Sequence, residues 1–111
     1  MAKIEVLGIS NCDTCKKALR ALQASGADAL LLDIRDEPLS ASYVSELYAL
    51  FGAALLNTRS TTWRGLSDAE RSLDPLLLLG KYPTLMKRPV IRSGDRTTLG
   101  WTKEVQTHWA V

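Results

Sequence analysis

The chain is poor in the residues that build metal centres. It has two cysteines, Cys12 and Cys15, and a single histidine, His108, among its 111 residues. A structural zinc site needs about four ligands, commonly two cysteine pairs or one pair joined by histidines. We therefore expect neither a metal site nor a tightly bound cofactor.

The sequence also lacks long apolar runs and a strong charge of either sign. No apolar run approaches the ~20 residues of a membrane-spanning helix, and the opening Met1-Ala2-Lys3 leads into a strand-like segment with Glu5 inside it, unlike a signal peptide. A net charge of +2 is too small to indicate nucleic-acid binding. We expect a cytoplasmic protein with no membrane and no direct nucleic-acid partner. Because cytoplasmic thiols are kept reduced, a cysteine pair there indicates catalysis or sensing.

Length and composition predict a single domain over residues 1–111. The chain is 46% hydrophobic and 23% charged, as in ordinary folded proteins. No linker rich in proline, glycine or serine divides it.

The two cysteines stand at the expected start of a helix. An apolar run from Ile4 to Ile9 precedes them, and Cys15, Ala18 and Leu22 follow at helical spacing. The first turn of a helix presents unpaired N–H groups and the positive end of the helix dipole, which favour a thiolate. Cys12 is therefore the predicted nucleophile. Cys15, one turn deeper on the apolar face, should be more buried and would resolve a mixed disulfide formed at Cys12.

Two other interpretations of the pair remain open. Cys15 could be an inert core residue, since it lies on the apolar face of the predicted helix. A permanent Cys12–Cys15 disulfide would close too short a loop to constrain the unfolded chain much.

Local patterns predict alternating strands and helices. Residues 3–8 and 29–34 are expected to form buried parallel strands, joined by a helix over 13–24 that ends at Ser25-Gly26. Ser40 is a predicted N-cap for a helix to about Phe51, with an apolar stripe of Tyr43, Val44, Leu47, Leu50 and Phe51. Short helices are predicted after Ser67 and from Asp74-Pro75 to Gly80, and a further turn at Pro83. Hairpin strands 89–92 and 97–101 and a last helix from Thr102 follow. The leucines at 76–79 also fit a buried strand, but Pro75 and Gly80 favour a helix.

Three motifs in this order resemble one protein family. They are NCDTCKKA at 11–18, LLNTRSTTWR at 55–64 and KRP at 87–89. Together they resemble the arsenate reductase (ArsC) family, within it the YffB and Spx-like branch, over essentially the whole chain. The resemblance implies an α/β thioredoxin-like fold with a mixed four-stranded sheet and a helical insertion between the second and third strands.

The resemblance also assigns roles to residues. Cys12 matches the family's nucleophilic cysteine, Arg88 an arginine that helps to bind the oxyanion, and Pro89 a cis-proline beside the active cysteine. Arg59 and Arg64 lie in the second motif, where a guanidinium could hold a substrate carboxylate or oxyanion. Each of these two arginines could equally be a solvated loop charge.

Two departures point away from arsenate. Where arsenate reductases carry a histidine four residues before the cysteine, this chain has Gly8, and Trp101 stands in place of a third arginine. An arsenate oxyanion needs several fixed donors. With Cys15, the chain instead carries the Cys-x-x-Cys motif that is found in Spx regulators.

Three functions follow as hypotheses. The first is a thiol-disulfide oxidoreductase for a small thiol or oxyanion substrate, with glutathione as thiol co-substrate and glutaredoxin or thioredoxin as protein partner. The second is an Spx-like redox switch that binds RNA polymerase. The third is arsenate reduction itself.

Overall fold

The computed structural model describes residues 3–111, which divide into two compact units. One unit joins the chain up to Glu37 with Arg88–Val111, and the other is Pro38–Lys87. The single domain predicted from the sequence stays a prediction. Within residues 3–111, every helix is too short or too polar to cross a bilayer.

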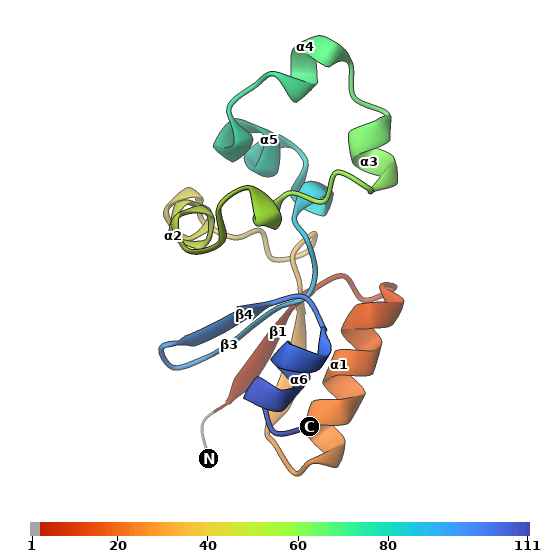
Figure 1. Cartoon of the computed structure of the whole chain (residues 1–111), viewed down its shortest axis with the longest axis vertical. Coiled ribbons are helices and arrows are strands. Elements are labelled where there is room, and N and C mark those ends of the chain that lie inside the picture. Colours follow the sequence, from red (N-terminus) through yellow and green to blue (C-terminus); the bar gives the residue numbers. More distant parts are fainter. Residues whose placement is uncertain (1–2) are drawn as a thin grey trace. The chain divides into compact units, whose positions relative to one another are not determined.

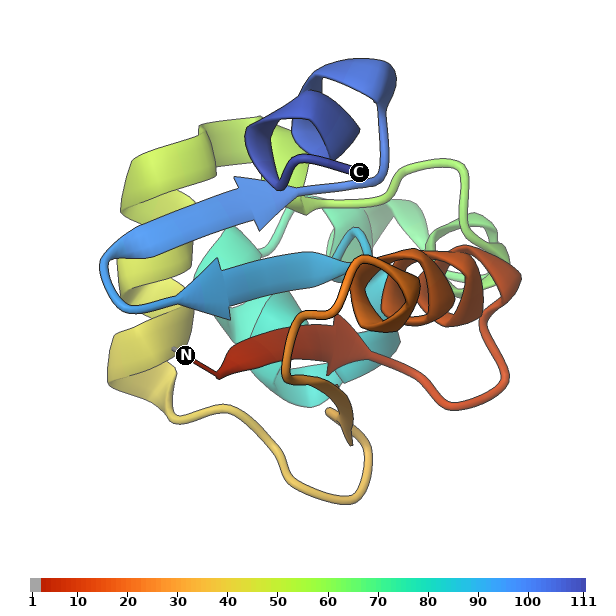
Figure 2. The ribbon, with the colours of Figure 1, turned by 90° about the horizontal axis from the view of Figure 1, so that it is seen from below.

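The first unit is built on a mixed sheet of four strands (Figure 1). They are β1 (Ile4–Gly8), β2 (Ala29–Asp33), β3 (Val90–Ser93) and β4 (Arg96–Leu99), in the order β2-β1-β3-β4. β1 pairs parallel with β2 and antiparallel with β3, and β3 pairs antiparallel with β4. Figure 2 shows β1, β3 and β4 side by side. This sheet confirms the predicted α/β fold class and thioredoxin-like strand arrangement.

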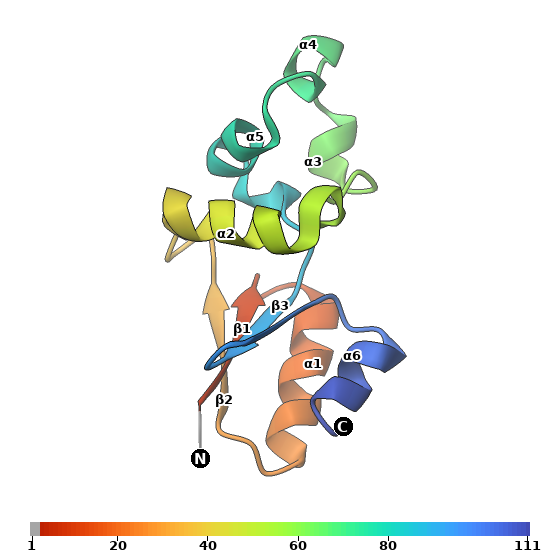
Figure 3. The same cartoon turned by 60° about the vertical axis from the view of Figure 1, so that its left-hand side comes forward.

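Two helices cover one face of this sheet (Figure 3). They are α1 (Asp13–Ala24), which connects β1 to β2, and α6 (Lys103–His108), which follows β4. The core between sheet and helices consists of Val6, Ala18, Leu22, Ala29, Ile91 and Trp109, with Trp101 partly buried against it. Since α1 begins where β1 ends, its packing fixes the position of the cysteine loop that joins the two.

The second unit is helical. It contains α2 (Ala41–Phe51), the 3₁₀ turn η1 (Gly52–Leu55), α3 (Thr61–Arg64), α4 (Asp68–Arg71), α5 (Pro75–Lys81) and the 3₁₀ turn η2 (Pro83–Leu85). Leu56 and Met86 form an isolated antiparallel bridge, extended by bonds from Asn57 N to Leu85 O and from Lys87 N to Leu55 O. This bridge ties the two ends of the loop-rich segment together.

Most predicted elements are confirmed, with small differences. The leucine run is helical, and it divides into buried Leu78 and Leu79 and exposed Leu77. Leu50 was wrongly placed on the apolar stripe of α2, because its side chain is 61% exposed. The short helix α3 was not predicted, since its four residues are too few to show a period.

Candidate active site

The N-terminus of α1 differs from those of the other α-helices among residues 3–111. In α2 to α6 the N-cap side chain accepts a hydrogen bond from a first-turn amide; these caps are Ser40, Ser60, Ser67, Asp74 and Thr102. The N-cap of α1 is Cys12, with extended backbone angles and no side-chain cap bond. A residue type that caps poorly therefore occupies the position where a negative charge is best stabilised.

The surroundings of Cys12 favour its thiolate. Partial burial by itself raises the pKa of Cys12, but the amide and thiol of Cys15 and the Arg88 guanidinium outweigh that effect and hold the pKa below its ordinary value. The backbone amide of Cys15 is the N3 group of α1, so it acts as a cap for the charged sulfur. Cys12 is half-buried, in contrast to Cys15.

Cys15 has the opposite character. Its side chain is fully buried, and burial, followed by the neighbouring Cys12, raises the pKa of Cys15 to about 12. The Ile9 amide donates to its sulfur and only partly offsets this. Cys15 is therefore a neutral thiol that can donate a hydrogen bond to the Cys12 thiolate. This donation by the Cys15 thiol is one of the causes of the lowered pKa of Cys12.

Gly8 makes the position of Cys15 possible. A Cβ built on Gly8 would lie within 3.0 Å of Cys15 Sγ, closer than side-chain carbons approach in real structures, and 3.2 Å from Cys15 Cβ. The last residue of β1 must therefore lack a side chain while a thiol fills this space. In this backbone, a histidine at position 8 and a thiol at position 15 exclude each other.

Arg88 and Pro89 bring the third motif to the cysteine. The Arg88–Pro89 peptide bond is cis, as the resemblance implies. The Pro89 carbonyl accepts a hydrogen bond from Gly100 N at 2.8 Å, which ties it to the end of β4. Pro89 is buried, whereas Arg88 is half-buried with its guanidinium beside Cys12. Cys12, Cys15, Arg88 and Pro89 thus belong to one site within the first unit.

A carboxylate anchors the loop that carries Cys12. Asp33, the last residue of β2, accepts hydrogen bonds from Ser10 N at 2.9 Å and from Arg35 N at 2.9 Å. The Arg35 guanidinium adds a two-pronged ion pair, Nε to Oδ1 at 3.2 Å and Nη2 to Oδ2 at 2.9 Å. Together these donors, the Arg35 side chain first, hold the pKa of Asp33 well below its usual range.

Arg59 and Arg64 both belong to the second unit, but only Arg59 lines a pocket there. Arg59 lines a surface pocket of about 650 Å³ together with Leu56, Asn57 and Lys87, among others. Its backbone amide donates to Asn57 Oδ1 at 3.2 Å, which fixes the loop. Arg64 ends α3, is exposed, does not line this pocket, and offers its carbonyl to Arg71 Nη2 at 3.2 Å.

Sequence reasoning missed two features of the site. The Asp33–Arg35 pair had a detectable signal, an Asp-x-Arg at the end of the second predicted strand, but only the parallel pairing of β1 and β2 brings it to the cysteine loop. The contact of Gly8 with Cys15 had no local signal. Among residues 3–111, no three His, Cys, Asp or Glu side chains gather as metal ligands.

Comparisons with known proteins agree with the motifs. The model of the ArsC family matches residues 7–107. An uncharacterized protein of Haemophilus influenzae is 40% identical, covering 96% of this chain and 99% of its own, and the uncharacterized protein YusI of Bacillus subtilis is 29% identical, covering 89% and 92%. The solved structure of the YFFB (PA3664) protein has a TM-score of 0.88 at 27% identity, covering 97% of this chain and 99% of its own. An arsenate reductase (ArsC) related protein from Brucella melitensis has a TM-score of 0.76 at 29% identity, covering 98% and 96%.

Proposed function

The chain belongs to the ArsC family, and on that premise we propose that it is a thiol-disulfide oxidoreductase that uses the Cys12 thiolate as its nucleophile and glutathione or thioredoxin as its reductant. The observation that carries the proposal is the half-buried Cys12 at the N-cap of α1, whose pKa is lowered, beside Arg88. A substrate disulfide can reach this sulfur, and the thiolate form is the one that attacks.

The first step forms a mixed disulfide. The Cys12 thiolate attacks one sulfur of a substrate disulfide, the substrate S–S bond breaks, and the departing sulfur leaves as a thiolate that takes a proton from water. Arg88 lies where it would bind an anionic group of the substrate or stabilise the departing charge, because its guanidinium faces Cys12.

The second step releases the substrate. Once Cys12 is part of a mixed disulfide it no longer carries a charge, so its contribution to the raised pKa of Cys15 disappears. The Cys15 sulfur then attacks Cys12, the bond between Cys12 and the substrate breaks, and the Cys15 proton passes through water to the departing sulfur, so that the Cys12–Cys15 disulfide forms and the substrate leaves as a second thiol. Two glutathione molecules, oxidised to glutathione disulfide, or one reduced thioredoxin would return both cysteines to thiols. A glutathione thiolate attacking Cys12 directly would make Cys15 dispensable.

The pocket of the second unit is proposed as a binding place for substrate carboxylates. Arg59 and Lys87 line it, and neither side chain has an ion-pair partner among the contacts of residues 3–111 given by the structure. Glutathione carries two carboxylates that such a pair of cations would hold. Arg59→Gln should weaken the equilibrium binding of glutathione measured by titration calorimetry, whereas Arg64→Gln, which lies outside the pocket, is the matched control.

Turnover of a small disulfide by glutathione tests the proposal. Cys12→Ser should abolish turnover, and Cys15→Ala separates the two routes: retained turnover indicates resolution by glutathione, and loss with a trapped mixed disulfide indicates resolution by Cys15. Full turnover by Cys12→Ser would refute the proposal.

The other two hypotheses have their own tests. A redox switch is favoured by the interaction of the Cys15 thiol with Cys12. The amount of RNA polymerase recovered in a pull-down should then differ between the reduced and the oxidised protein. Arsenate reduction is disfavoured by the Cys15 thiol, which fills the space beside Gly8, and by Trp101, which packs against the core. An assay with arsenate, glutathione and glutaredoxin should give no turnover.

A further inference from the structure

The cysteine loop between β1 and α1 is held at three points. Ile34 N donates to Gly8 O at 2.9 Å, Ser10 N donates to Asp33 Oδ2 at 2.9 Å, and Cys12 N donates to Ile9 O at 3.0 Å. The middle contact is the only one of the three that uses a side chain. A loop that must present a nucleophile in one orientation is thus pinned by a carboxylate from the neighbouring strand.

Asp33 suits this role because of its place in the sheet. It pairs in register with Gly8, so the two parallel strands end side by side and the carboxylate faces the chain that leaves β1. Its side chain is only 8% exposed, although it carries a charge. Two backbone amides and one guanidinium satisfy its oxygens.

The charge of Asp33 would oppose the thiolate if it stood alone. Ser10 precedes Cys12 by two residues, so their Cα atoms are at most about 7 Å apart. A bare carboxylate bonded to Ser10 N would thus stand roughly 10 Å from the thiolate, where it repels the negative sulfur and raises the pKa of Cys12. Arg35 faces both Asp33 oxygens, and its Nη2 also lies 3.4 Å from Ser10 Oγ. Its guanidinium therefore neutralises the carboxylate that anchors the loop.

We propose that Asp33 and Arg35 form a positioning pair, in which Asp33 fixes the loop that carries Cys12 and Arg35 cancels the carboxylate charge beside the thiolate. Neither residue touches a reacting atom. The inference rests on the proposed nucleophile Cys12, but its test measures the thiol itself and does not require turnover.

Single substitutions in the pair should shift the Cys12 thiol in opposite directions. Arg35→Gln leaves the Asp33 carboxylate unbalanced, so the pH midpoint of Cys12 alkylation by iodoacetamide should rise. The expected rise is roughly 0.3–1.2 units, from Coulomb's law for a carboxylate and a thiolate about 10 Å apart at effective dielectric constants of about 20–80. Asp33→Asn leaves the guanidinium unbalanced, and the midpoint should fall. The double variant should return close to the wild-type midpoint.

A purely structural role gives a different result. If the pair only held the loop together, both single variants would move the midpoint the same way, toward an ordinary thiol, and the double variant would not restore it. Shifts of equal sign, or no shift, would overturn the charge-balancing role. Alkylation should be measured in a Cys15→Ala background, so that Cys12 is the reacting thiol.

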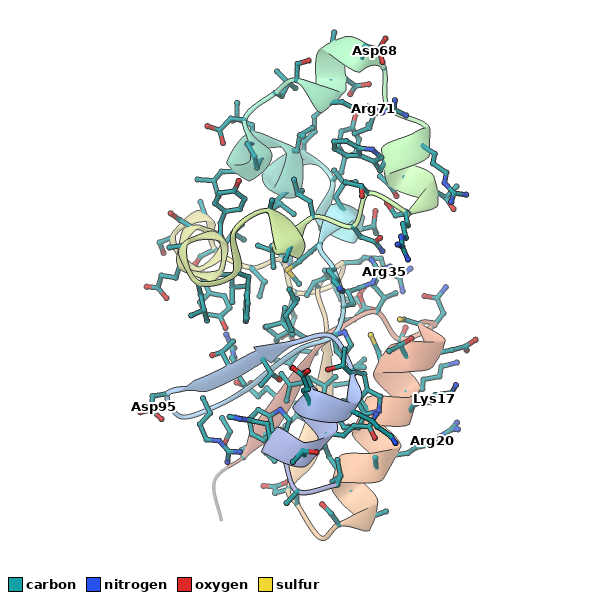
Figure 4. All side chains as sticks on the ribbon, in the orientation of Figure 1. Lys17, Arg20, Arg35, Asp68, Arg71 and Asp95 are labelled. Atoms are coloured by element: carbon teal, nitrogen blue, oxygen red, sulfur yellow. The ribbon has the colours of Figure 1, made fainter. Side chains whose placement is uncertain are left out.

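Two controls complete the experiment. Arg20 lies in α1 and projects outward from it (Figure 4), so Arg20→Gln removes a positive charge from the same unit without touching the loop. Its shift should stay below about 0.2 units, because an exposed charge roughly 12 Å along the helix is largely screened. Asp33→Ala should also increase hydrogen exchange of the Ser10 amide by tenfold or more over Asp33→Asn, which keeps an acceptor. Equal exchange in the two variants would overturn the anchoring role.

Discussion

Replacing Cys12 by serine should stabilise the protein while it removes the nucleophile. Within the described residues 3–111, five α-helices have an N-cap side chain that accepts a hydrogen bond from a first-turn amide, and α1, which begins after Cys12, does not. Serine is among the best N-cap residues, and a good cap contributes about 1 kcal/mol relative to a poor one. The serine hydroxyl would accept the Cys15 amide that now faces a neutral thiol at acid pH. For a chain of this size, about 1 kcal/mol corresponds to a rise in Tm of roughly 4–8 °C.

The advantage of serine should depend on pH, since the thiolate is itself a cap. The pKa of Cys12 in the folded protein lies below the ordinary value of 9.0. For an acid whose pKa is lowered on folding, the stabilisation is present above the unfolded pKa and is lost as the pH falls through the folded one. The difference in Tm between Cys12→Ser and the wild type should therefore be greatest below the pKa of Cys12 in the folded protein. It should shrink as the pH rises toward 9, the ordinary pKa of the thiol.

Thermal unfolding followed by circular dichroism, with the thiols kept reduced, measures both effects. Cys12→Ala removes the thiol without adding an acceptor and is the matched control, while Thr102→Ala shows what loss of an existing cap costs in α6. Equal Tm values for Cys12→Ser and Cys12→Ala at acid pH would refute the reasoning. A Tm difference between Cys12→Ser and wild type that does not change with pH would refute the thiolate cap.

Three further predictions concern the neighbours of Cys12. Cys15→Ala should raise the pKa of Cys12, because its thiol no longer donates to the thiolate; an ultraviolet titration of thiolate absorbance measures this, and an unchanged or lower midpoint would contradict it. Gly8→Ala should cost about 1–3 kcal/mol in urea unfolding by overpacking, and most of that cost should vanish in a Cys15→Gly background; additive costs would contradict the proposed contact. Arg88→Gln should also raise the pKa of Cys12 and slow its alkylation at neutral pH, whereas Arg20→Gln, at an exposed position of α1, should leave both nearly unchanged.

The elements of the fold could be predicted because their signals are local. Ser40, Pro75 and Thr102 each mark a helix start by their own chemistry, and the helices begin where these residues place them. The exposure of Leu50 could not be predicted in the same way. A helical period shows which residues share a face, but only tertiary packing decides how far the buried part of that face extends.

The candidate site likewise has features that depend on local sequence and features that depend on long-range contacts. The thiolate character of Cys12 follows from its place before a helix, and the burial of Cys15 follows from the apolar face that it shares with Ala18 and Leu22. The roles of Gly8 and Asp33 depend on contacts between segments far apart in the sequence. Ser10 and Asp33 are separated by 23 residues, and no local pattern links them.

The discontinuous first unit has a consequence for biosynthesis. Cys12 is made early, but Arg88 and the β3 strand that pairs with β1 lie beyond the whole segment Pro38–Lys87. At about 5–20 residues per second, the 76 residues from position 12 to position 88 take roughly 4–15 s to translate. During that time the nascent chain carries a cysteine that lacks its guanidinium neighbour. The ribosome therefore delivers a cysteine that has only the groups of α1 to stabilise its thiolate, and Arg88 joins them only when about the last fifth of the polypeptide, residues 88–111, has emerged and β3 has paired with β1.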